Sequence, residues 1–199
     1  MIRSCFNNHN INTYLVPHIH SAKIETTFNK CFKRMYSSSK SKNLTHIDEQ
    51  GKASMVDVST KNVTSRTATA KGSVYVGASI TKLIKENNIK KGDVLGVAKL
   101  AGIMAAKKTS ELVPLCHNIS LNNIKVDTSL DEEKNIVFIE ATVSCDGKTG
   151  VEMEALTAVS IAALTIYDMC KAVNKKMIIK DIYLVRKTGG SSGIHDFEI

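Results

Sequence analysis

Residues 148–158 read Lys-Thr-Gly-Val-Glu-Met-Glu-Ala-Leu-Thr-Ala, and residues 165–171 read Thr-Ile-Tyr-Asp-Met-Cys-Lys. Between Ala155 and Ile166 every residue is apolar or carries a small hydroxyl group. A helix that is apolar on all sides is expected to be buried on all sides. Acids and a lysine at the ends of a buried helix cost free energy unless they are paired or functional. We therefore expect the chemistry at the two ends of this helix.

The charged residues at these ends allow two interpretations each. Glu152 and Glu154 at a helix start complement the macrodipole, and the spacing from Thr149 to Glu152 matches a capping box. Asp168 and Lys171, three residues apart, can form a modest ion pair on the helix surface. However, Asp168 follows three turns of apolar helix, so we expect it near the core. A shielded Asp beside a Lys can serve as an acid or a base.

The length of the helix separates the two charged ends. Glu154 and Asp168 are 14 residues apart, which corresponds to about 21 Å along a helix. A single small-molecule site cannot easily contact both from one chain. A domain with one sheet also cannot cover every face of such a helix. We therefore expect either two sites, or one site that is completed across a subunit boundary.

The charge of the chain is unevenly distributed. The net charge is +8 over 199 residues, but residues 1–43 hold seven Lys and Arg and one acid. The other 156 residues carry 20 basic and 18 acidic groups. A chain of this length forms one domain with an appendage. Because the body is nearly neutral, a general surface for nucleic acid is not indicated.

Residues 1–43 have the composition of an organelle transit peptide, being basic, almost free of acids and rich in Ser, Asn and His. Arg34-Met35-Tyr36-Ser37 resembles a mitochondrial processing site, so we expect the mature protein in the mitochondrial matrix. The alternative is a disordered tail. No apolar run is expected to reach the roughly 18 residues that span a bilayer, so a membrane is not expected as a partner.

The five cysteines, at positions 5, 31, 116, 145 and 170, are odd in number and include no Cys-x-x-Cys pair. A disulfide framework or a zinc site is therefore not expected, and a reducing compartment is the default. We expect neither a metal nor another cofactor. Cys116-His117 could supply a nucleophile or one metal ligand, but adjacent side chains diverge and no second ligand lies nearby in the sequence.

The pattern of the body predicts strand, two helices, two strands, helix and strand. The expected ranges are a strand at 66–76, helices at 78–88 and 94–112, a hairpin of strands at 119–129 and 135–145, the apolar helix to about residue 173, and a strand at 177–187. Asp93 is a candidate N-cap, and a flexible tail is expected to begin at Gly189. This order indicates an α+β fold with a ferredoxin-like antiparallel sheet and helices packed on one face.

Two further segments could bind phosphate. Lys90-Lys91-Gly92-Asp93 is usually a solvated turn, but it could present Lys91 to a phosphate at a helix start. Residues 187–193 read Lys-Thr-Gly-Gly-Ser-Ser-Gly and could cradle a phosphate through backbone N–H groups, with Lys187 adding charge. A flexible terminus is the simpler interpretation of the second segment.

At these residues the sequence resembles the molybdenum cofactor biosynthesis protein C family, whose members are cyclic pyranopterin monophosphate synthases. The resemblance extends from Leu44 to about Gly193. Its most specific parts are residues 149–156 and 164–173, and others are Met55-Val56-Asp57-Val58-Ser59, Lys91-Gly92-Asp93, Ala101-Gly102-Ile103, Pro114-Leu115-Cys116-His117 and Lys187-Thr188-Gly189-Gly190.

The resemblance implies a lyase that converts (8S)-3′,8-cyclo-7,8-dihydroguanosine 5′-triphosphate into cyclic pyranopterin monophosphate and releases pyrophosphate. It implies a homohexamer, built as a trimer of dimers, with active sites at the dimer interface. The matching catalytic positions are Asp168, Lys171 and Lys91. The matching positions for substrate binding are Cys116, His117, Glu152, Met153, Glu154, Lys107, Arg66 and Lys187.

Two positions depart from the family pattern. Asn118 stands where the family usually has Pro after the His, and the tail Ile194–Phe197 is longer than the usual Gly-Asp-Phe ending. The competing hypothesis is a non-catalytic ferredoxin-like module that binds nucleotide or RNA, because such sheets often bind nucleic acid. Exposed aromatic residues on strands would favour it, but the body holds few aromatics.

Overall fold

The computed structural model describes residues 50–87, 89–90 and 92–197 of the chain. The predicted transit peptide and its boundary with the body, between residues 43 and 44, lie outside this range, as does Lys91. The strands are β1 (Thr64–Tyr75), β2 (Asn123–Asp131), β3 (Ile136–Gly147), β4 (Ile178–Thr188) and β5 (His195–Asp196). The helices are α2 (Ala78–Lys85), α3 (Val94–Ala106), α4 (Thr109–Leu112) and α5 (Glu152–Cys170).

The strands form one five-stranded sheet in the order β2-β3-β1-β4-β5, and every neighbouring pair is antiparallel. Side chains alternate between the two faces of each strand. On β1, Ala68, Ala70 and Val74 are buried, and the intervening residues Thr69 and Lys71 point to the opposite face. The prediction of an α+β fold with an antiparallel sheet is confirmed.

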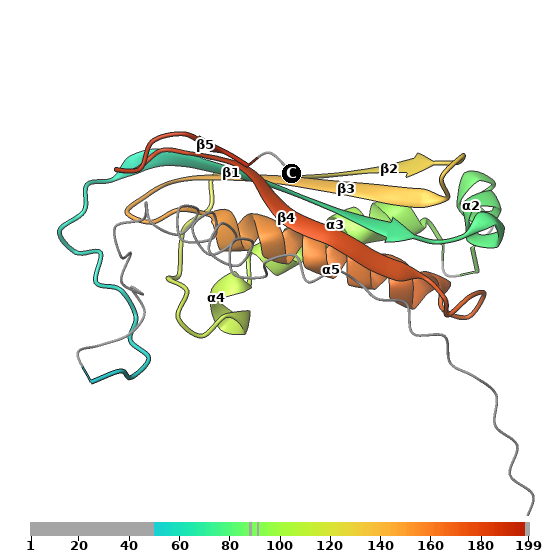
Figure 1. Ribbon diagram of the computed structural model, residues 1–199, viewed down its shortest axis with the longest axis horizontal. Coiled ribbons are helices and arrows are strands. Elements are labelled where there is room, and N and C mark those ends of the chain that lie inside the picture. Colours follow the sequence, from blue (N-terminus) through green and yellow to red (C-terminus); the bar gives the residue numbers. More distant parts are fainter. Residues whose placement is uncertain (1–49, 88, 91, 198–199) are drawn as a thin grey trace, which may run out of the picture. The chain divides into compact units, whose positions relative to one another are not determined.

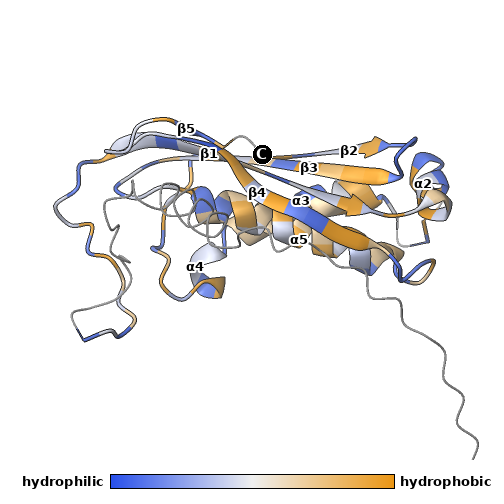
Figure 2. Ribbon diagram, viewed as in Figure 1, coloured by the Kyte–Doolittle hydropathy of each residue, from blue (hydrophilic) through white to orange (hydrophobic). Residues whose placement is uncertain are grey.

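Helices α3 and α5 pack on one face of this sheet and run in opposite directions (Figure 1). Figure 2 shows that both helices are largely hydrophobic. Two glycines permit close approach to α5: a Cβ on Gly72 of β1 would lie 2.6 Å from Val159, and one on Gly102 of α3 would lie 2.9 Å from the carbonyl oxygen of Ala158. The core therefore lies between α5, α3 and the sheet.

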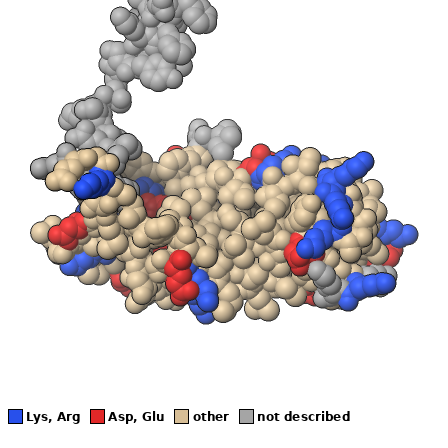
Figure 3. All heavy atoms as spheres, turned by 90° about the horizontal axis from the view of Figure 1, so that it is seen from below, with Lys and Arg blue, Asp and Glu red and all other residues tan. Residues whose placement is uncertain are grey.

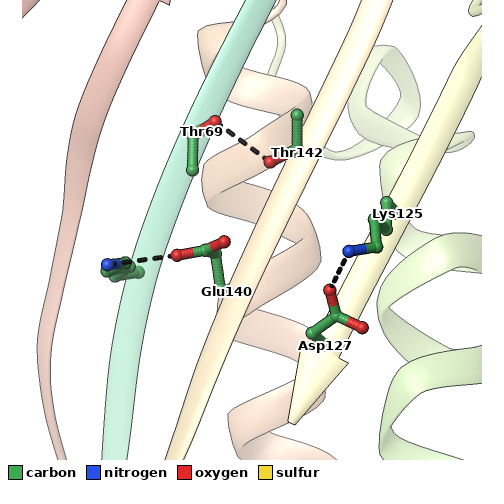
Figure 4. Close-up of polar contacts among 6 residues, drawn as sticks. Thr69, Lys125, Asp127, Glu140 and Thr142 are labelled. Atoms are coloured by element: carbon green, nitrogen blue, oxygen red, sulfur yellow. Dashed lines mark hydrogen bonds and ion pairs between the residues drawn. The ribbon is translucent and has the colours of Figure 1, made fainter.

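The other face of the sheet is open and carries polar pairs (Figure 4). Thr69 and Thr142 share a hydrogen bond of 3.0 Å between β1 and β3. Lys71 pairs with Glu140 across the same two strands at 3.1 Å, and Lys125 pairs with Asp127 along β2 at 2.7 Å. A concavity of about 780 Å³ lies on this face. None of the residues predicted to be functional lines it.

The predicted single helix at 94–112 is wrong, because the structure has two helices separated at Lys107 and Lys108. The buried Thr109 hydroxyl donates to the carbonyl oxygens of Ala105 and Ala106, at 3.4 and 3.0 Å. Both carbonyls lie at the end of α3. In a continuing helix they would accept hydrogen bonds from backbone N–H groups of the next turn, and here the Thr109 hydroxyl donates to them. Asp93 caps α3 as expected and accepts from the Gly96 N–H at 2.9 Å.

The predicted flexible tail is also wrong for the described residues. After a turn at Gly189–Gly193, β5 pairs with β4, and the Phe197 N–H donates to the Val185 carbonyl oxygen at 2.8 Å. The Gly residues at 189, 190 and 193 all have positive φ, which lets the chain reverse at low cost. The tail therefore forms the edge of the sheet.

Helix α5 is not buried on all sides within one chain, contrary to the expectation from its composition. Its residues facing the sheet and α3 are fully buried, but Met153 and Leu164 are exposed. By length and composition alone α5 could cross a membrane, which corrects the expectation that no apolar segment is long enough. Half of that apolar window is buried inside the protein, as is typical of a core helix.

Candidate active site

A pocket of about 560 Å³ lies at the N-terminal end of α5. Arg66 and Lys187 are on neighbouring strands, and their register partners Cys145 and Ala68 are buried on the face of the sheet that the helices cover. Because α5 begins only at Glu152, this end of the sheet extends past the helix. The side chains of Arg66, Lys187 and Glu152 therefore line an open space instead of the core.

Direct contacts hold the charged groups of this pocket in place. Lys187 Nζ lies 2.8 Å from Glu152 Oε1, and each side chain is only about one quarter exposed. The Arg66 guanidinium donates through Nε to the Gly147 carbonyl oxygen at 2.8 Å. A Cβ on Gly150 would collide with the Glu152 carboxylate, and one on Gly190 would collide with Arg66 Nη1. The two glycines therefore leave the space that these side chains occupy.

The pocket is strongly cationic. Lys61 and Lys148 line it together with Arg66 and Lys187, and Glu152 is the one acid among the residues that line it. The N-terminal end of α5 adds a partial positive charge. Guanidinium and ammonium groups are the usual protein ligands of phosphate oxygens. The arrangement is therefore suited to a ligand that carries several negative charges.

Glu154 lies in the first turn of α5 and is 4% exposed. Burial raises the pKa of its carboxyl group, and the charge of Glu152 raises it further, while a hydrogen bond from its own backbone opposes both. A carboxyl group of this kind keeps its proton to a higher pH than an ordinary glutamic acid. It can therefore act as a proton donor in the first turn of α5.

Cys116 and His117 lie in the loop that follows α4. Burial raises the pKa of the Cys116 thiol, and the charge of Glu154 adds to the rise, so Cys116 lies near Glu154 but is not activated as a nucleophile. His117 is partly buried, and its Nε2 lies 2.8 Å from the Val56 carbonyl oxygen. The structure thus brings both residues toward the N-terminal end of α5.

The predicted capping box at this end is wrong. Val151 is the N-cap of α5, and no side chain accepts a hydrogen bond from the first turn in a capping position. Glu152 is instead drawn toward Lys187. The two acids of the first turn still complement the helix dipole.

Asp168 and Lys171 form an ion pair at the opposite end of α5, with 2.6 Å between Oδ1 and Nζ. Their side chains are 56% and 51% exposed, so the expectation that Asp168 lies near the core is wrong. Ile166, Met169 and Cys170 occupy the buried side of this last turn, and the helical period turns Asp168 outward. The hydrogen bond and the charge of Asp168 raise the pKa of Lys171.

Of the other predicted residues that the structure describes, Lys107 and Met153 do not line the pocket. Lys107 is the C-cap of α3. Since α3 and α5 run in opposite directions, it lies toward the end of the molecule where α5 begins (Figure 1). The Met153 side chain is exposed on α5. Lys91 lies outside the described residues.

Sequence reasoning missed Lys61 and Lys148 as pocket residues. Lys148 stands two residues before Gly150, and this proximity to the helix start could have identified it. Lys61 gives no comparable signal, because it precedes the first strand. Within the described part of the chain, no group of three or more His, Cys, Asp or Glu side chains could hold a metal ion.

Comparison with known proteins identifies relatives of this chain. A sequence model of the MoaC family matches residues 55–190. The cyclic pyranopterin monophosphate synthase of Parvibaculum lavamentivorans is 59% identical over 152 residues, which cover 76% of this chain and 95% of the relative. The enzyme of the same name from Thermoanaerobacter sp. is 55% identical over 157 residues, covering 79% and 99%. A mitochondrial one from Arabidopsis thaliana is 57% identical over 150 residues, covering 75% and 56%.

Proposed function

The chain belongs to the MoaC family, and we propose that it is a cyclic pyranopterin monophosphate synthase, a lyase of molybdenum cofactor (molybdopterin) biosynthesis. It converts (8S)-3′,8-cyclo-7,8-dihydroguanosine 5′-triphosphate into cyclic pyranopterin monophosphate and releases pyrophosphate. This reaction needs a site for a triphosphate and groups that move protons while the purine ring opens and the pterin forms. Family membership favours this enzyme over a non-catalytic module that binds nucleotide or RNA.

One observation of the structure supports this function above the others. The cationic pocket lies at the N-terminal end of α5, and the buried carboxyl group of Glu154 belongs to the first turn of the same helix. Arg66, Lys187 and Lys148 carry the charge that a triphosphate needs. Burial raises the pKa of the Glu154 carboxyl group, so it keeps its proton to a higher pH than an ordinary glutamic acid. The N-terminal end of α5 thus offers both an anion-binding pocket and a carboxyl group that can donate a proton.

We assign the residues to roles as follows. Arg66 and Lys187, with Lys107 toward the same end, bind the phosphates. Asp168, Lys171 and Lys91 move protons. The groups around the guanine-derived ring are Cys116, His117, Glu152, Met153 and Glu154.

The two charged ends of α5 act in one site only if two chains supply them, because they are about 21 Å apart along the helix. We propose that each active site lies between two subunits and that the enzyme is a homohexamer, a trimer of dimers. The helix layer supports association, since Val97, Leu100, Met104 and Leu164 are exposed on it. Figure 3 shows this side as a broad uncharged area among the described residues. Exposed apolar patches of this kind mark interfaces.

The experiment that tests the function is incubation of the purified protein with the cyclised precursor. Release of pyrophosphate and appearance of cyclic pyranopterin monophosphate, followed by an enzyme-coupled assay and by fluorescence of the oxidised pterin, are the expected results. The Lys171→Ala variant is the matched negative control. A properly folded oligomer that binds the precursor but releases no pyrophosphate would exclude this function.

We propose that residues 1–43 direct the protein to the mitochondrial matrix. Their basic composition and the mitochondrial relative from Arabidopsis thaliana support this location. A fluorescent protein fused to residues 1–43 should enter mitochondria, and a full-length fusion in which their Lys and Arg are replaced by Gln should not. Removal of residues 1–43 should leave turnover unchanged, because none of the proposed site residues lies there. A cytosolic fusion would contradict the targeting role.

A further inference from the structure

The segment Val56–Ser59, which precedes β1, contacts two residues of the candidate site. Its Val56 carbonyl oxygen lies 2.8 Å from His117 Nε2, and its Ser59 carbonyl oxygen accepts from Lys148 Nζ at 2.7 Å. His117 follows α4, and Lys148 precedes α5. Both contacts use backbone carbonyls, so they depend on the path of the segment.

The path of this segment is fixed by Asp57. Its Oδ1 accepts from the Ser59 N–H at 2.8 Å and from the Ser59 hydroxyl at 2.5 Å. These bonds make a local turn of the kind that Asp side chains favour. They also lower the pKa of Asp57, the side-chain bond most, and the nearby charges of Lys148 and His117 lower it further. The carboxylate thus stays ionised and keeps accepting both bonds.

The segment contributes little to the core. Asp57 and Ser59 are exposed, and the regular structure begins only at Thr64 of β1. The chain between them, however, lines the cationic pocket with Lys61 and Asn62, and β1 then supplies Arg66. The segment therefore runs along the site and not through the interior, so its two contacts serve the site more than the fold.

We propose that Val56–Ser59 is a strap that positions Lys148 and His117 at the cationic pocket, and that Asp57 is the positioning residue that sets its path. The inference rests on the proposed function for the ligand of that pocket. A lysine side chain has many rotamers, and fixing it before the ligand binds removes most of the entropy cost of ordering it. Held by the Ser59 carbonyl, Lys148 stays at the pocket edge.

The test compares three variants in the full-length protein. Asp57→Ala removes the turn. Asp57→Asn keeps an oxygen that can accept the same two bonds. Asp131→Ala is the matched control, because Asp131 also accepts a backbone N–H, from Lys134 at 2.9 Å, in the turn between β2 and β3. The dissociation constant for inorganic pyrophosphate, KM, kcat and the thermal midpoint are measured for each.

Asp57→Ala is expected to raise KM and the pyrophosphate dissociation constant about tenfold, the scale of one lost charge-assisted contact, with a smaller change in kcat. Asp57→Asn is expected to restore both constants, and Asp131→Ala to leave them unchanged. Unaltered pyrophosphate binding in Asp57→Ala would contradict the proposed role of the strap. An equal loss of pyrophosphate affinity in Asp57→Asn or in Asp131→Ala would contradict it as well. Pyrophosphate binding is measured without turnover, so a failure of the proposed reaction is recognised separately.

Discussion

The two ends of helix α5 carry similar charged groups in very different surroundings. At the N-terminal end Glu154 is 4% exposed, and Glu152 pairs with Lys187, both only about one quarter exposed. At the C-terminal end the pair of Asp168 and Lys171 is more than half exposed. The sheet extends past the start of the helix and shields the pair of Glu152 and Lys187. Within the described chain, nothing comparable covers the pair of Asp168 and Lys171.

This difference is the one expected if, as proposed, one chain builds only part of the site. The N-terminal end already has a shielded pocket with fixed charges. An acid and a lysine in contact with bulk water are poor at moving protons selectively, because solvent screens their charges. If Asp168 and Lys171 are catalytic, a neighbouring subunit has to enclose them.

Lys171→Ala is expected to reduce kcat by about 10²–10⁴-fold, the usual effect of removing a positioned general acid or base. The chain should still fold, since Lys171 is half exposed within it. Lys85→Ala is the matched control, because Lys85 forms a similar exposed pair with Glu132 at 2.8 Å outside the proposed site. Single-turnover kinetics and light scattering are the measurements. Near-normal turnover of Lys171→Ala would remove it from the mechanism, and Lys91→Ala is expected to behave as Lys171→Ala does.

Mixing inactive Lys171→Ala and Glu154→Ala subunits under exchange conditions is expected to restore activity. If the two ends of α5 from different chains meet, each mixed dimer has one intact and one doubly defective site, so random exchange gives about a quarter of the wild-type activity. Native mass spectrometry verifies that mixed oligomers form. Mixed oligomers without activity would show that the two residues do not act across a subunit boundary.

Glu154→Gln is expected to increase stability at neutral pH while it impairs catalysis. Burial raises the pKa of Glu154, so the folded protein holds a proton that the unfolded chain releases once the pH exceeds about 4.3. Stability from this group is therefore complete below that pH and falls as the pH rises toward the folded pKa. Glutamine does not ionise, so the variant does not lose this stability as the pH rises.

The thermal midpoint of Glu154→Gln should therefore exceed that of the wild type near pH 7, and the difference should vanish near pH 4. Glu152→Gln is the control, because it loses the ion pair with Lys187 and should gain no stability. Differential scanning calorimetry across this pH range is the measurement. A midpoint difference that does not vary with pH would contradict the raised pKa as the cause.

Gly190→Ala is expected to weaken pyrophosphate binding about threefold to tenfold by displacing Arg66, at the scale of part of one charged contact. Gly193→Ala is the matched control. Both glycines have positive φ, 76° and 70°, but only the Cβ at position 190 would meet Arg66, and the one at 193 meets nothing within 4 Å. Both variants should lose about 1–2 kcal/mol from backbone strain. Equal binding by the two would exclude the contact with Arg66 as the cause.

Most elements could be predicted from the sequence, because their patterns are local. The alternation of β1 and β3, the apolar length of α5 and the Asp93 cap each depend on residues within a few positions of one another. The break before α4 could not be predicted in this way. It depends on the buried Thr109 hydroxyl, and an isolated Thr does not reveal whether it will bond to the preceding turn.

The site was only partly predictable, for a related reason. The family resemblance indicates Arg66, Lys187, Glu152 and Glu154, and the structure brings these four to one end of α5. Lys148 was missed although it stands just before the start of α5, and its contact with Ser59 comes from a segment distant in the chain. Asp168 was expected near the core because apolar residues precede it. That expectation failed because apolar neighbours along the chain do not specify which side of a helix faces solvent.

Local sequence patterns specify the types of the elements, the apolar length of α5 and the separation of its two charged ends. These properties follow from the period and rise of a helix and a strand, which hold wherever the element lies. Which of the charged side chains are shielded from solvent follows from the folded arrangement. Burial depends on neighbours that are distant in the chain, and Arg66 from β1, Lys187 from β4 and Glu152 from α5 meet only when the sheet has formed.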